Sequence, residues 1–225
     1  MLAHLSDSII NNILALSPLI VYGERGVGKT IFLYQLARSL EKHGLSIYFW
    51  TTHSSLRTLR SILRSTQLSD SIMIFVVEDY SISLRLEALS KIFDHIKHSL
   101  EQKEISCAII LDDFLPVNIL LSAKIDPHYA KFLTTMLFWL STVSRVEGIF
   151  FVGSTIENLR TGCPFKARLM AAYKFNFMRI SRISRVRELT HVQMTSERIP
   201  VTIEKKPLWK AIISARGFVF IKEHS

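Results

Sequence analysis

The strongest chemical signal in the sequence is a glycine-rich segment between Gly23 and Thr30. Its residues, GERGVGKT, fit the pattern G-x-x-x-x-G-K-[ST]. Glycine at Gly23, Gly26 and Gly28 permits backbone angles and close approaches that a Cβ would block, so the loop's amides can converge on phosphate oxygens. In this pattern Lys29 reaches the β- and γ-phosphates, and the hydroxyl of Thr30 binds Mg²⁺. The segment therefore predicts a site for a nucleoside triphosphate.

The neighbouring residues give this loop the context that it requires. The apolar run Leu19–Tyr22 has the composition of a buried strand, and Ile31–Leu40 has the spacing of a helix. Strand, glycine loop and helix in this order define a P-loop, in which the positive end of the helix dipole also favours phosphate. The expected nucleotide contacts are Gly23, Glu24, Arg25, Gly26, Val27, Gly28, Lys29, Thr30 and Ile31.

A second segment can complete the site with a carboxylate. Cys107–Asp113, CAIILDD, is an apolar run that ends in two acids and resembles a Walker B strand. We expect Asp112 to hold Mg²⁺ together with Thr30, directly or through water. Lys29, Asp112 and Asp113 are the candidate catalytic residues. For Asp113, a solvated loop acid or a helix cap is the alternative interpretation.

The pattern leaves open which residue would polarise water for hydrolysis. Many P-loop ATPases carry Glu where this chain has the shorter Asp113, and others carry Glu after the second strand, where this chain reads Trp50–His53. Glu78 and Asp79 end a third predicted strand and are further candidates. The expected ligands are thus ATP and Mg²⁺, with slow turnover or binding without hydrolysis as the two outcomes.

Strands alternate with helices between residues 19 and 153, which indicates a parallel sheet covered on both faces. The expected strands are 19–22, 46–50, 71–77, 105–111 and 148–152, and the expected helices are 2–16, 31–40, 54–66, 83–104 and 127–146. Residues 154–172 are predicted to be mainly loop. The strand-like segments 173–180, 186–194, 199–203, 208–213 and 217–221 have short connections, which predict antiparallel hairpins. We expect a single domain of residues 1–225, with a nucleotide-binding core (1–156) and a basic C-terminal region (157–225).

Charge is distributed unevenly along the chain. The 225 residues include 28 Lys or Arg and 19 Asp or Glu, a net charge of +9. Residues 1–156 hold 14 groups of each sign, whereas residues 157–206 hold 11 basic and 4 acidic groups. A charge-balanced body followed by a basic region predicts a polyanionic partner, and a generally basic surface is the alternative.

The composition bounds the class of protein. With 48% hydrophobic residues the chain can build a substantial core. No uninterrupted apolar run reaches the roughly 18 residues of a membrane helix. No basic segment near the start marks a signal peptide, so we expect a cytoplasmic protein without a membrane partner.

The order of these elements resembles the ATPase core of the RecA/RadA recombinase family, including its short archaeal paralogues and KaiC-like relatives. The resemblance spans residues 8–222 and rests on the GERGVGKT loop, the AIILDD and GIFFVGST strands, a loop at Glu157–Lys166 and the closing GFVFIKE segment. It implies an α/β fold of the RecA-like P-loop NTPase type. The central sheet would be mostly parallel and flanked by helices, with antiparallel β-hairpins at the C-terminal end.

The chain departs from this family at three places. The family's catalytic Glu falls on Thr52, and its sensor residue, usually Gln, falls on Ser154 or a neighbour. Only 17 residues precede Pro18, so we expect neither a separate N-terminal DNA-binding domain nor a polymerisation linker. These departures favour a paralogue that assists a recombinase, with weak hydrolysis, over a recombinase.

The resemblance also implies a DNA-binding region. Arg160, Lys166 and Arg168 fall in the segment where the family contacts single-stranded DNA, and Arg182 and Arg185 follow in the first terminal strand. Basic side chains release counterions from phosphates and give sequence-independent affinity. An acidic protein partner, or an arginine that reaches the ATP of a neighbouring subunit, would explain the same residues. Arg179 and Arg187 belong to the same cluster, Phe165 is a candidate for base stacking, and Tyr173, Phe175 and Phe177 are expected to face the core.

Two functional hypotheses follow. The first is an ATP-binding RecA/RadA-like protein that acts with DNA, preferably single-stranded, in recombination or repair. Its partners would be a recombinase or another repair protein, or further copies of itself in a homo-oligomer. The second is a KaiC-like regulatory ATP-binding module that binds a protein and not DNA. A small-molecule kinase is disfavoured by the hairpin-rich C-terminal region.

Overall fold

The computed structural model describes residues 4–62, 72–77, 82–101, 106–115, 126–146, 148–164, 166–186, 189–197, 205–214 and 217–221. Its first elements are α1 (Asp7–Ala15), β1 (Leu19–Gly23), α2 (Lys29–Lys42), β2 (Ser46–Thr52), α3 (His53–Ile62) and β3 (Ile72–Val77). They are followed by α4 (Ile82–Glu101), β4 (Cys107–Leu115), α6 (Pro127–Val143) and β5 (Ile149–Asn158). The C-terminal elements are β6 (Cys163–Pro164), α7 (Ala167–Ala172), β7 (Asn176–Val186), β8 (Leu189–Glu197), β9 (Lys205–Ser214) and β10 (Gly217–Ile221).

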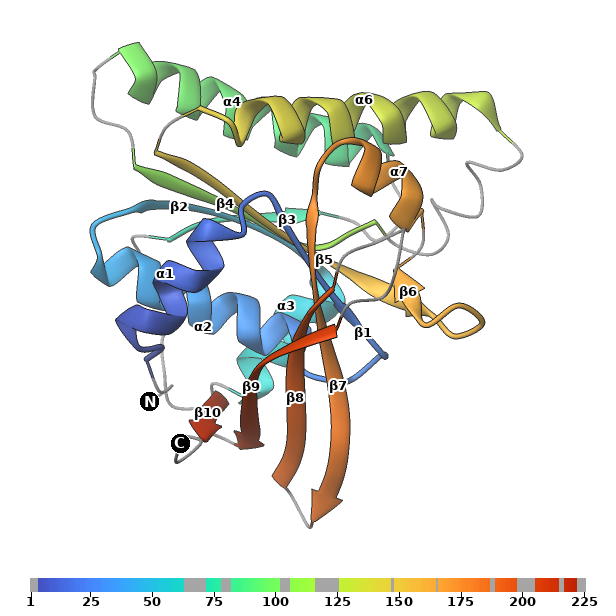
Figure 1. Ribbon diagram of the computed structural model, residues 1–225. Helices are drawn as coiled ribbons and strands as arrows, with labels where there is room; N and C mark the ends of the chain where they lie inside the picture. The colour runs from blue at the N-terminus through green and yellow to red at the C-terminus, as the bar shows by residue number, and fades with distance from the viewer. Residues whose placement is uncertain are drawn as a thin grey trace.

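The strands form one sheet with β1 near its middle (Figure 1). The order is β10-β9-β8-β7-β1-β5-β4-β2-β3, and β6 pairs with β5. Strands β3, β2, β4, β5, β1 and β7 run parallel, whereas β8, β9 and β10 are added by antiparallel pairing. The predicted α/β class is therefore confirmed, with a mostly parallel centre and antiparallel strands at the C-terminal end.

Helices cover both faces of the parallel part of the sheet. In Figure 1, α4 and α6 form a layer on one side, and α1, α2 and α3 lie on the other. Each layer contributes to its own core: Leu33 packs in the cluster with Val21, and Ile92 and Leu137 pack in the cluster with Ile109. Because both faces are buried, these strands are continuous apolar runs. No helix in the described ranges combines the length and apolar character that a membrane crossing requires.

The terminal strands pack directly on the helix that follows the glycine loop. The side-chain amide of Gln35 in α2 donates to the carbonyl oxygen of Phe218 and accepts from its N–H, both at 2.8 Å. The rings of Phe32 and Phe218 also meet edge to face, with 5.5 Å between their centroids. Strand β10 is thus fixed to α2 by a paired hydrogen bond in a buried setting, where such bonds are costly to lose.

Two predicted segments differ from the structure. Residues 154–172 are not mainly loop, because β5 continues to Asn158, turns back into β6 and is followed by α7. Strand β4 continues past Asp112 to Leu115 instead of ending at residue 111. In both cases, strand pairing continues through polar residues that the sequence pattern takes as an end.

The first C-terminal strand begins later than expected. Tyr173 follows the last turn of α7, and β7 begins at Asn176 in parallel with β1. Phe175 and Phe177 are buried, as predicted. The hairpins begin only with β8. The predicted strand 199–203, together with Glu78, Asp79, Phe165 and Arg187, lies outside the described residues.

Candidate functional site

The glycine loop joins the end of β1 to the start of α2, where the parallel and C-terminal parts of the sheet meet. The backbone of β7 approaches Gly23 so closely that a Cβ there would collide with the carbonyl oxygen of Ile180. Gly28 has a φ of +92°, and a Cβ on it would lie 2.7 Å from Cδ1 of Ile213 in β9. Glycine is therefore needed at both ends of the loop because the C-terminal strands pack against it.

Lys29, the first residue of α2, turns its side chain back over the loop. Its Nζ donates to the carbonyl oxygens of Gly23 at 2.9 Å and Glu24 at 2.8 Å. Burial lowers the pKa of the Lys29 ammonium, while the carboxylates of Asp112 and Asp113 act in the opposite direction. The ammonium is therefore close to both the loop and the acidic end of β4, where a phosphate group would match its charge.

Asp112 lies fully inside the protein and is surrounded by hydroxyl groups from three other elements. Its Oδ1 accepts from Thr30 Oγ1 at 3.1 Å and from Ser154 Oγ at 2.8 Å, and its Oδ2 accepts from Thr51 Oγ1 at 3.3 Å. Burial raises the pKa of Asp112, and the hydroxyls of Ser154 and Thr30 oppose that shift. The carboxylate thus meets the predicted metal-binding hydroxyl of Thr30 at the base of the loop.

The structure brings Lys29, Thr30 and Asp112 together and places the other predicted contacts around them. Among the other loop residues, Glu24, Arg25 and Gly26 are exposed, Val27 is buried and Ile31 is half-buried. Because the side chain of Val27 packs in the core, only its backbone is available to a ligand in this loop.

Two hydroxyls at Asp112 were not assigned this role from the sequence. Thr51 lies next to the last residue of the neighbouring strand β2, and Ser154 lies in β5 on the other side of β4. The sequence could have indicated these two residues, because the carboxyl ends of neighbouring parallel strands meet at one edge of the sheet. Thr52, at the place of the family's catalytic Glu, instead accepts a hydrogen bond from Ser55 N–H at 3.2 Å at the start of α3.

Asp113 is neither a solvated loop acid nor a helix cap. It lies within β4, is half-buried and has a φ of +49°. Its N–H donates to the hydroxyl of Ser154 at 2.8 Å, and that hydroxyl donates in turn to Asp112. The two acids are therefore linked through one serine.

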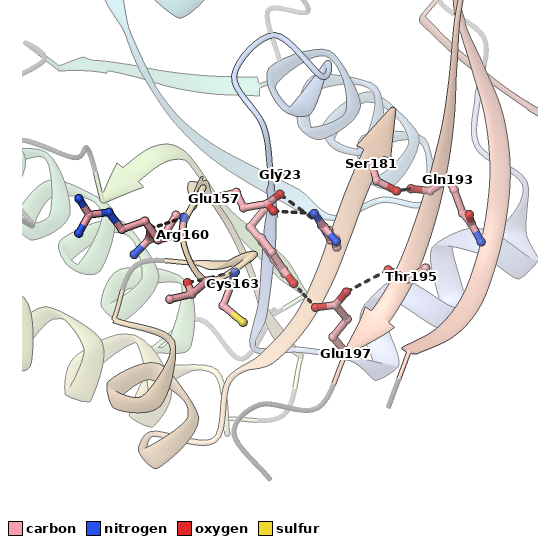
Figure 2. A network of polar contacts seen from close by, with 12 residues as sticks. Gly23, Glu157, Arg160, Cys163, Ser181, Gln193, Thr195 and Glu197 are labelled. Carbon is pink, nitrogen blue, oxygen red and sulfur yellow. Dashed lines mark hydrogen bonds and ion pairs between the residues drawn. The ribbon is translucent and has the colours of Figure 1, made fainter. Parts of the chain in front are cut away.

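A second polar cluster lies between β1, β5, β7 and β8 (Figure 2). Glu157 accepts two hydrogen bonds from Arg179, at 2.5 Å from Nη2 and 3.2 Å from Nε. The hydroxyl of Tyr22 donates to Glu197, which also accepts from Thr195 Oγ1 at 3.4 Å. Burial and the contact with Glu197 raise the pKa of Tyr22. Although burial favours the neutral form of Arg179, the ion pair with Glu157 raises its pKa.

The basic residues predicted to bind DNA are divided among several elements. Arg160 is exposed in the turn between β5 and β6, Lys166 is half-buried before α7, and Arg168 is exposed on α7. Arg182 and Arg185 are exposed in β7. Arg179 differs from them in being half-buried and paired with Glu157.

The register of the strands relates Arg182 and Arg185 to the glycine loop. The pairing of β1 with β7 ends at Tyr22 and Arg179, and β7 continues to Val186. Since the two strands are parallel, this extension of β7 projects from the edge of the sheet that also carries the loop.

Comparison with known proteins supports the fold. No family model and no curated protein sequence matches the chain. A solved structure, the KaiC-like protein PH0186 from the hyperthermophilic archaeon Pyrococcus horikoshii OT3, superposes with a TM-score of 0.57 at 14% identity. The match covers 91% of this chain and 88% of that one. The sheet order, the P-loop and this similarity define an α/β protein with the RecA-like P-loop fold.

Proposed function

We propose that this chain binds ATP with Mg²⁺ at the glycine loop. The observation that carries the proposal is the 3.1 Å contact between Thr30 Oγ1 and Asp112 Oδ1 beside the ammonium of Lys29. Hydroxyl and carboxylate oxygens are the hard ligands that Mg²⁺ takes in nucleotide sites. A buried carboxylate that is held by neutral hydroxyls also has a charge that a cation would compensate. The donor set therefore fits the metal.

The residues of the chain have distinct parts in this proposal. The loop amides and the start of α2 receive the phosphates, and Lys29 exchanges its carbonyl contacts for phosphate oxygens. Thr30 and Asp112 hold the ion, whose charge stabilises negative charge on the phosphates. Thr52 stands where the family carries its catalytic Glu, and its hydroxyl binds the start of α3. We therefore expect slow hydrolysis, with Asp113 as the candidate base because it follows Asp112 in β4.

We further propose that the basic C-terminal region holds single-stranded DNA, and that the protein acts with a recombinase or another repair protein. The exposed Arg182 and Arg185 on the extension of β7 support this proposal, as does the net positive charge of residues 157–206. Arg182 and Arg185 lie at the same edge of the sheet as the glycine loop, so a bound nucleotide has a physical route by which to influence DNA binding.

The test is binding of a fluorescent single-stranded oligonucleotide across a salt series, with and without Mg·ATP. We expect binding that weakens steeply with salt. The double variant Arg182→Gln/Arg185→Gln should reduce the slope of log K against log salt by about 1.4. The control Lys97→Gln/Lys131→Gln removes the same charge from exposed positions of α4 and α6 and should leave the slope unchanged. Absence of binding at low salt in both nucleotide states would refute the DNA part of the proposal.

A KaiC-like regulatory module is the second candidate, and the similarity to a KaiC-like protein favours it. In this alternative the basic residues meet a protein, or the ATP of a neighbouring copy. Analytical ultracentrifugation with and without Mg·ATP separates the two functions. An ATP-dependent assembly that loses its stability in the Arg182→Gln/Arg185→Gln variant, together with no DNA binding, would establish the second candidate over the first.

A further inference from the structure

Strand β4 contains a bulge at the site. Leu111 pairs with Gly153 and Leu115 pairs with Thr155, so residues 112–114 of β4 lie opposite the single residue Ser154 of β5. Bulges of this kind bend a strand and re-aim its side chains, and they are common beside active sites. Here the bulge contains both acids of the site.

Side chains satisfy the backbone groups of this bulge. The N–H of Asp113 donates to Ser154 Oγ at 2.8 Å. The carbonyl oxygens of Asp113 and Phe114 accept from Nη1 of Arg85, at 3.2 and 3.3 Å. Because buried backbone groups require partners, these contacts favour the bulged conformation over a regular strand.

Arg85 reaches the bulge from the first turns of α4. It is fully buried, and its guanidinium carbon lies 5.2 Å from the centroid of the Trp50 ring. Arginine is almost never fully buried unless its donors are used. The observed contacts with Asp113 and Phe114 give this arginine a specific task at the tip of β4.

The bulge has a consequence for the two acids. In a regular strand, successive side chains point to opposite faces of the sheet. Here Asp112 contacts Thr30, and the next residue, Asp113, has a left-handed backbone conformation. Against the effect of burial, both carboxylates favour the charged form of Lys29. The bulge therefore sets the backbone from which Asp112 reaches the Thr30 hydroxyl.

We infer that Arg85 and Ser154 are positioning residues for the acidic end of the nucleotide site. They hold the β4 bulge so that the carboxylate of Asp112 meets the Thr30 hydroxyl of the P-loop. The inference rests on the proposed ATP site and adds two residues to it. Arg85 acts through the backbone of β4, and Ser154 acts through that backbone and through its hydrogen bond to Asp112. Neither residue needs to touch the nucleotide.

The first experiment separates metal binding from phosphate binding. Affinity for a fluorescent ATP analogue is measured in EDTA and in Mg²⁺ for wild type, Arg85→Met and Ser154→Ala. We expect the gain in affinity from Mg²⁺ to fall by about tenfold in both variants, as for other residues that orient metal ligands. Affinity in EDTA should stay close to that of wild type, because the loop amides and Lys29 are unchanged.

Two further variants sharpen this test. Arg85→Lys retains a cationic donor and should recover part of the Mg²⁺-dependent gain. Lys91→Met removes a cation from an exposed position of the same helix and should behave as wild type. If Arg85→Met does not fold, Ser154→Ala decides the result, because it changes one small side chain in β5.

The second experiment needs no nucleotide. Amide hydrogen exchange at Asp113 should become about tenfold faster in Ser154→Ala, which removes the acceptor of this N–H, because losing a hydrogen bond worth about 1.4 kcal/mol corresponds to a factor of ten. It should also become faster in Arg85→Met, because the bulge then loses its contacts at the carbonyl oxygens of Asp113 and Phe114. Exchange at Ile109, in the regular part of β4, should remain at the wild-type rate.

The outcomes distinguish this inference from the proposed function. A Mg²⁺-dependent gain that is unchanged in both folded variants would overturn the inference, and so would an equal loss of affinity with and without Mg²⁺. Unchanged exchange at Asp113 in both variants would also overturn it. Wild-type protein that binds no ATP under any condition would instead overturn the proposed function.

Discussion

Two buried groups of carboxylates lie near the end of β1, and their partners differ in charge. Asp112 accepts hydrogen bonds from neutral hydroxyls, including those of Thr30, Thr51 and Ser154. Glu157, in contrast, accepts two hydrogen bonds from the guanidinium of Arg179. Both acids are nearly inaccessible to water, with exposed fractions of 1% for Asp112 and 6% for Glu157.

This difference separates the proposed Mg²⁺ site from a contact that completes the fold. The chain itself supplies the countercharge to Glu157, so that pair has little need of a further ion. Burial desolvates the charge of Asp112 and raises its pKa, and the hydroxyl donors and the charge of Lys29 oppose that shift without cancelling it. A metal ion would remove that cost. Burial of an acid is therefore not evidence for function until its partners are known.

The largest expected effect comes from Lys29→Ala. Loss of the charge-assisted contacts to the phosphates should weaken ATP binding at least about 100-fold, as measured by titration calorimetry. Because burial already lowers the pKa of Lys29, the nucleotide-free protein should keep its fold and its stability. Lys42→Ala, at an exposed position near the end of the same helix, is the control. Equal affinities for the two variants would contradict the site.

Glu157→Gln should lower the stability of the protein and leave its ATP affinity unchanged, the reverse of Lys29→Ala. It leaves Arg179 without its carboxylate partner and should destabilise the protein by about 1–3 kcal/mol in chemical denaturation, below the usual cost of breaking a fully buried pair. ATP affinity should not change. The control is Glu87→Gln, which breaks an exposed pair with Lys91 and should have no measurable effect. If Glu157→Gln loses nucleotide affinity but not stability, the cluster belongs to the binding site and is not a structural contact.

Tyr22→Phe tests the same cluster through pH. Removing the donor to Glu197 should cost about 1–2 kcal/mol of stability at pH 7. The pKa of Tyr22 is raised above its ordinary value of 10.0, so above that pH the unfolded chain loses the proton while the folded chain keeps it. Wild-type stability should therefore fall as pH rises above 10.0, and its advantage over Tyr22→Phe should shrink. The pH range from about 9 to about 11 spans the pKa of a free tyrosine. A stability difference between wild type and Tyr22→Phe that stays constant over this range would exclude the linkage.

Asp112→Asn should change stability by a smaller amount than Glu157→Gln or Tyr22→Phe, and in the opposite direction. A neutral amide has no charge to desolvate, so the nucleotide-free protein should become more stable by about 1 kcal/mol. The stabilisation that Mg²⁺ adds to ATP binding should disappear in the same thermal-shift measurements. If Asp112→Asn destabilises the protein as Glu157→Gln does, both carboxylates have structural roles, and the distinction between the two clusters is wrong.

The sequence predicted the parts of the site that depend on local spacing. Lys29 and Thr30 belong to one short motif, and Asp112 ends an apolar run that had to be a central strand. The parallel sheet followed from the alternation of apolar runs and helices. These features arise within about 30 residues of chain, the length of one strand–helix–strand unit.

The missed features depend on contacts between distant residues. The β4 bulge uses Arg85, 28 positions before Asp113, and Ser154, 41 positions after it. Arg179 looked like its basic neighbours until its partner Glu157, 22 positions earlier, was known. Gly162 and Pro164 suggested a loop, whereas the chain there forms a turn and the short strand β6. No local pattern contains this information.

The paired hydrogen bond between Gln35 and Phe218 joins residues 183 positions apart. Phe218 and Ile213 also lie against Gly28, so the last hairpin packs directly on the glycine loop. Mutations in that hairpin should then mimic mutations in the loop, and Gly28, Ile213 and Phe218 should vary together during evolution. A library that randomises all three positions should yield active combinations that no single substitution reaches.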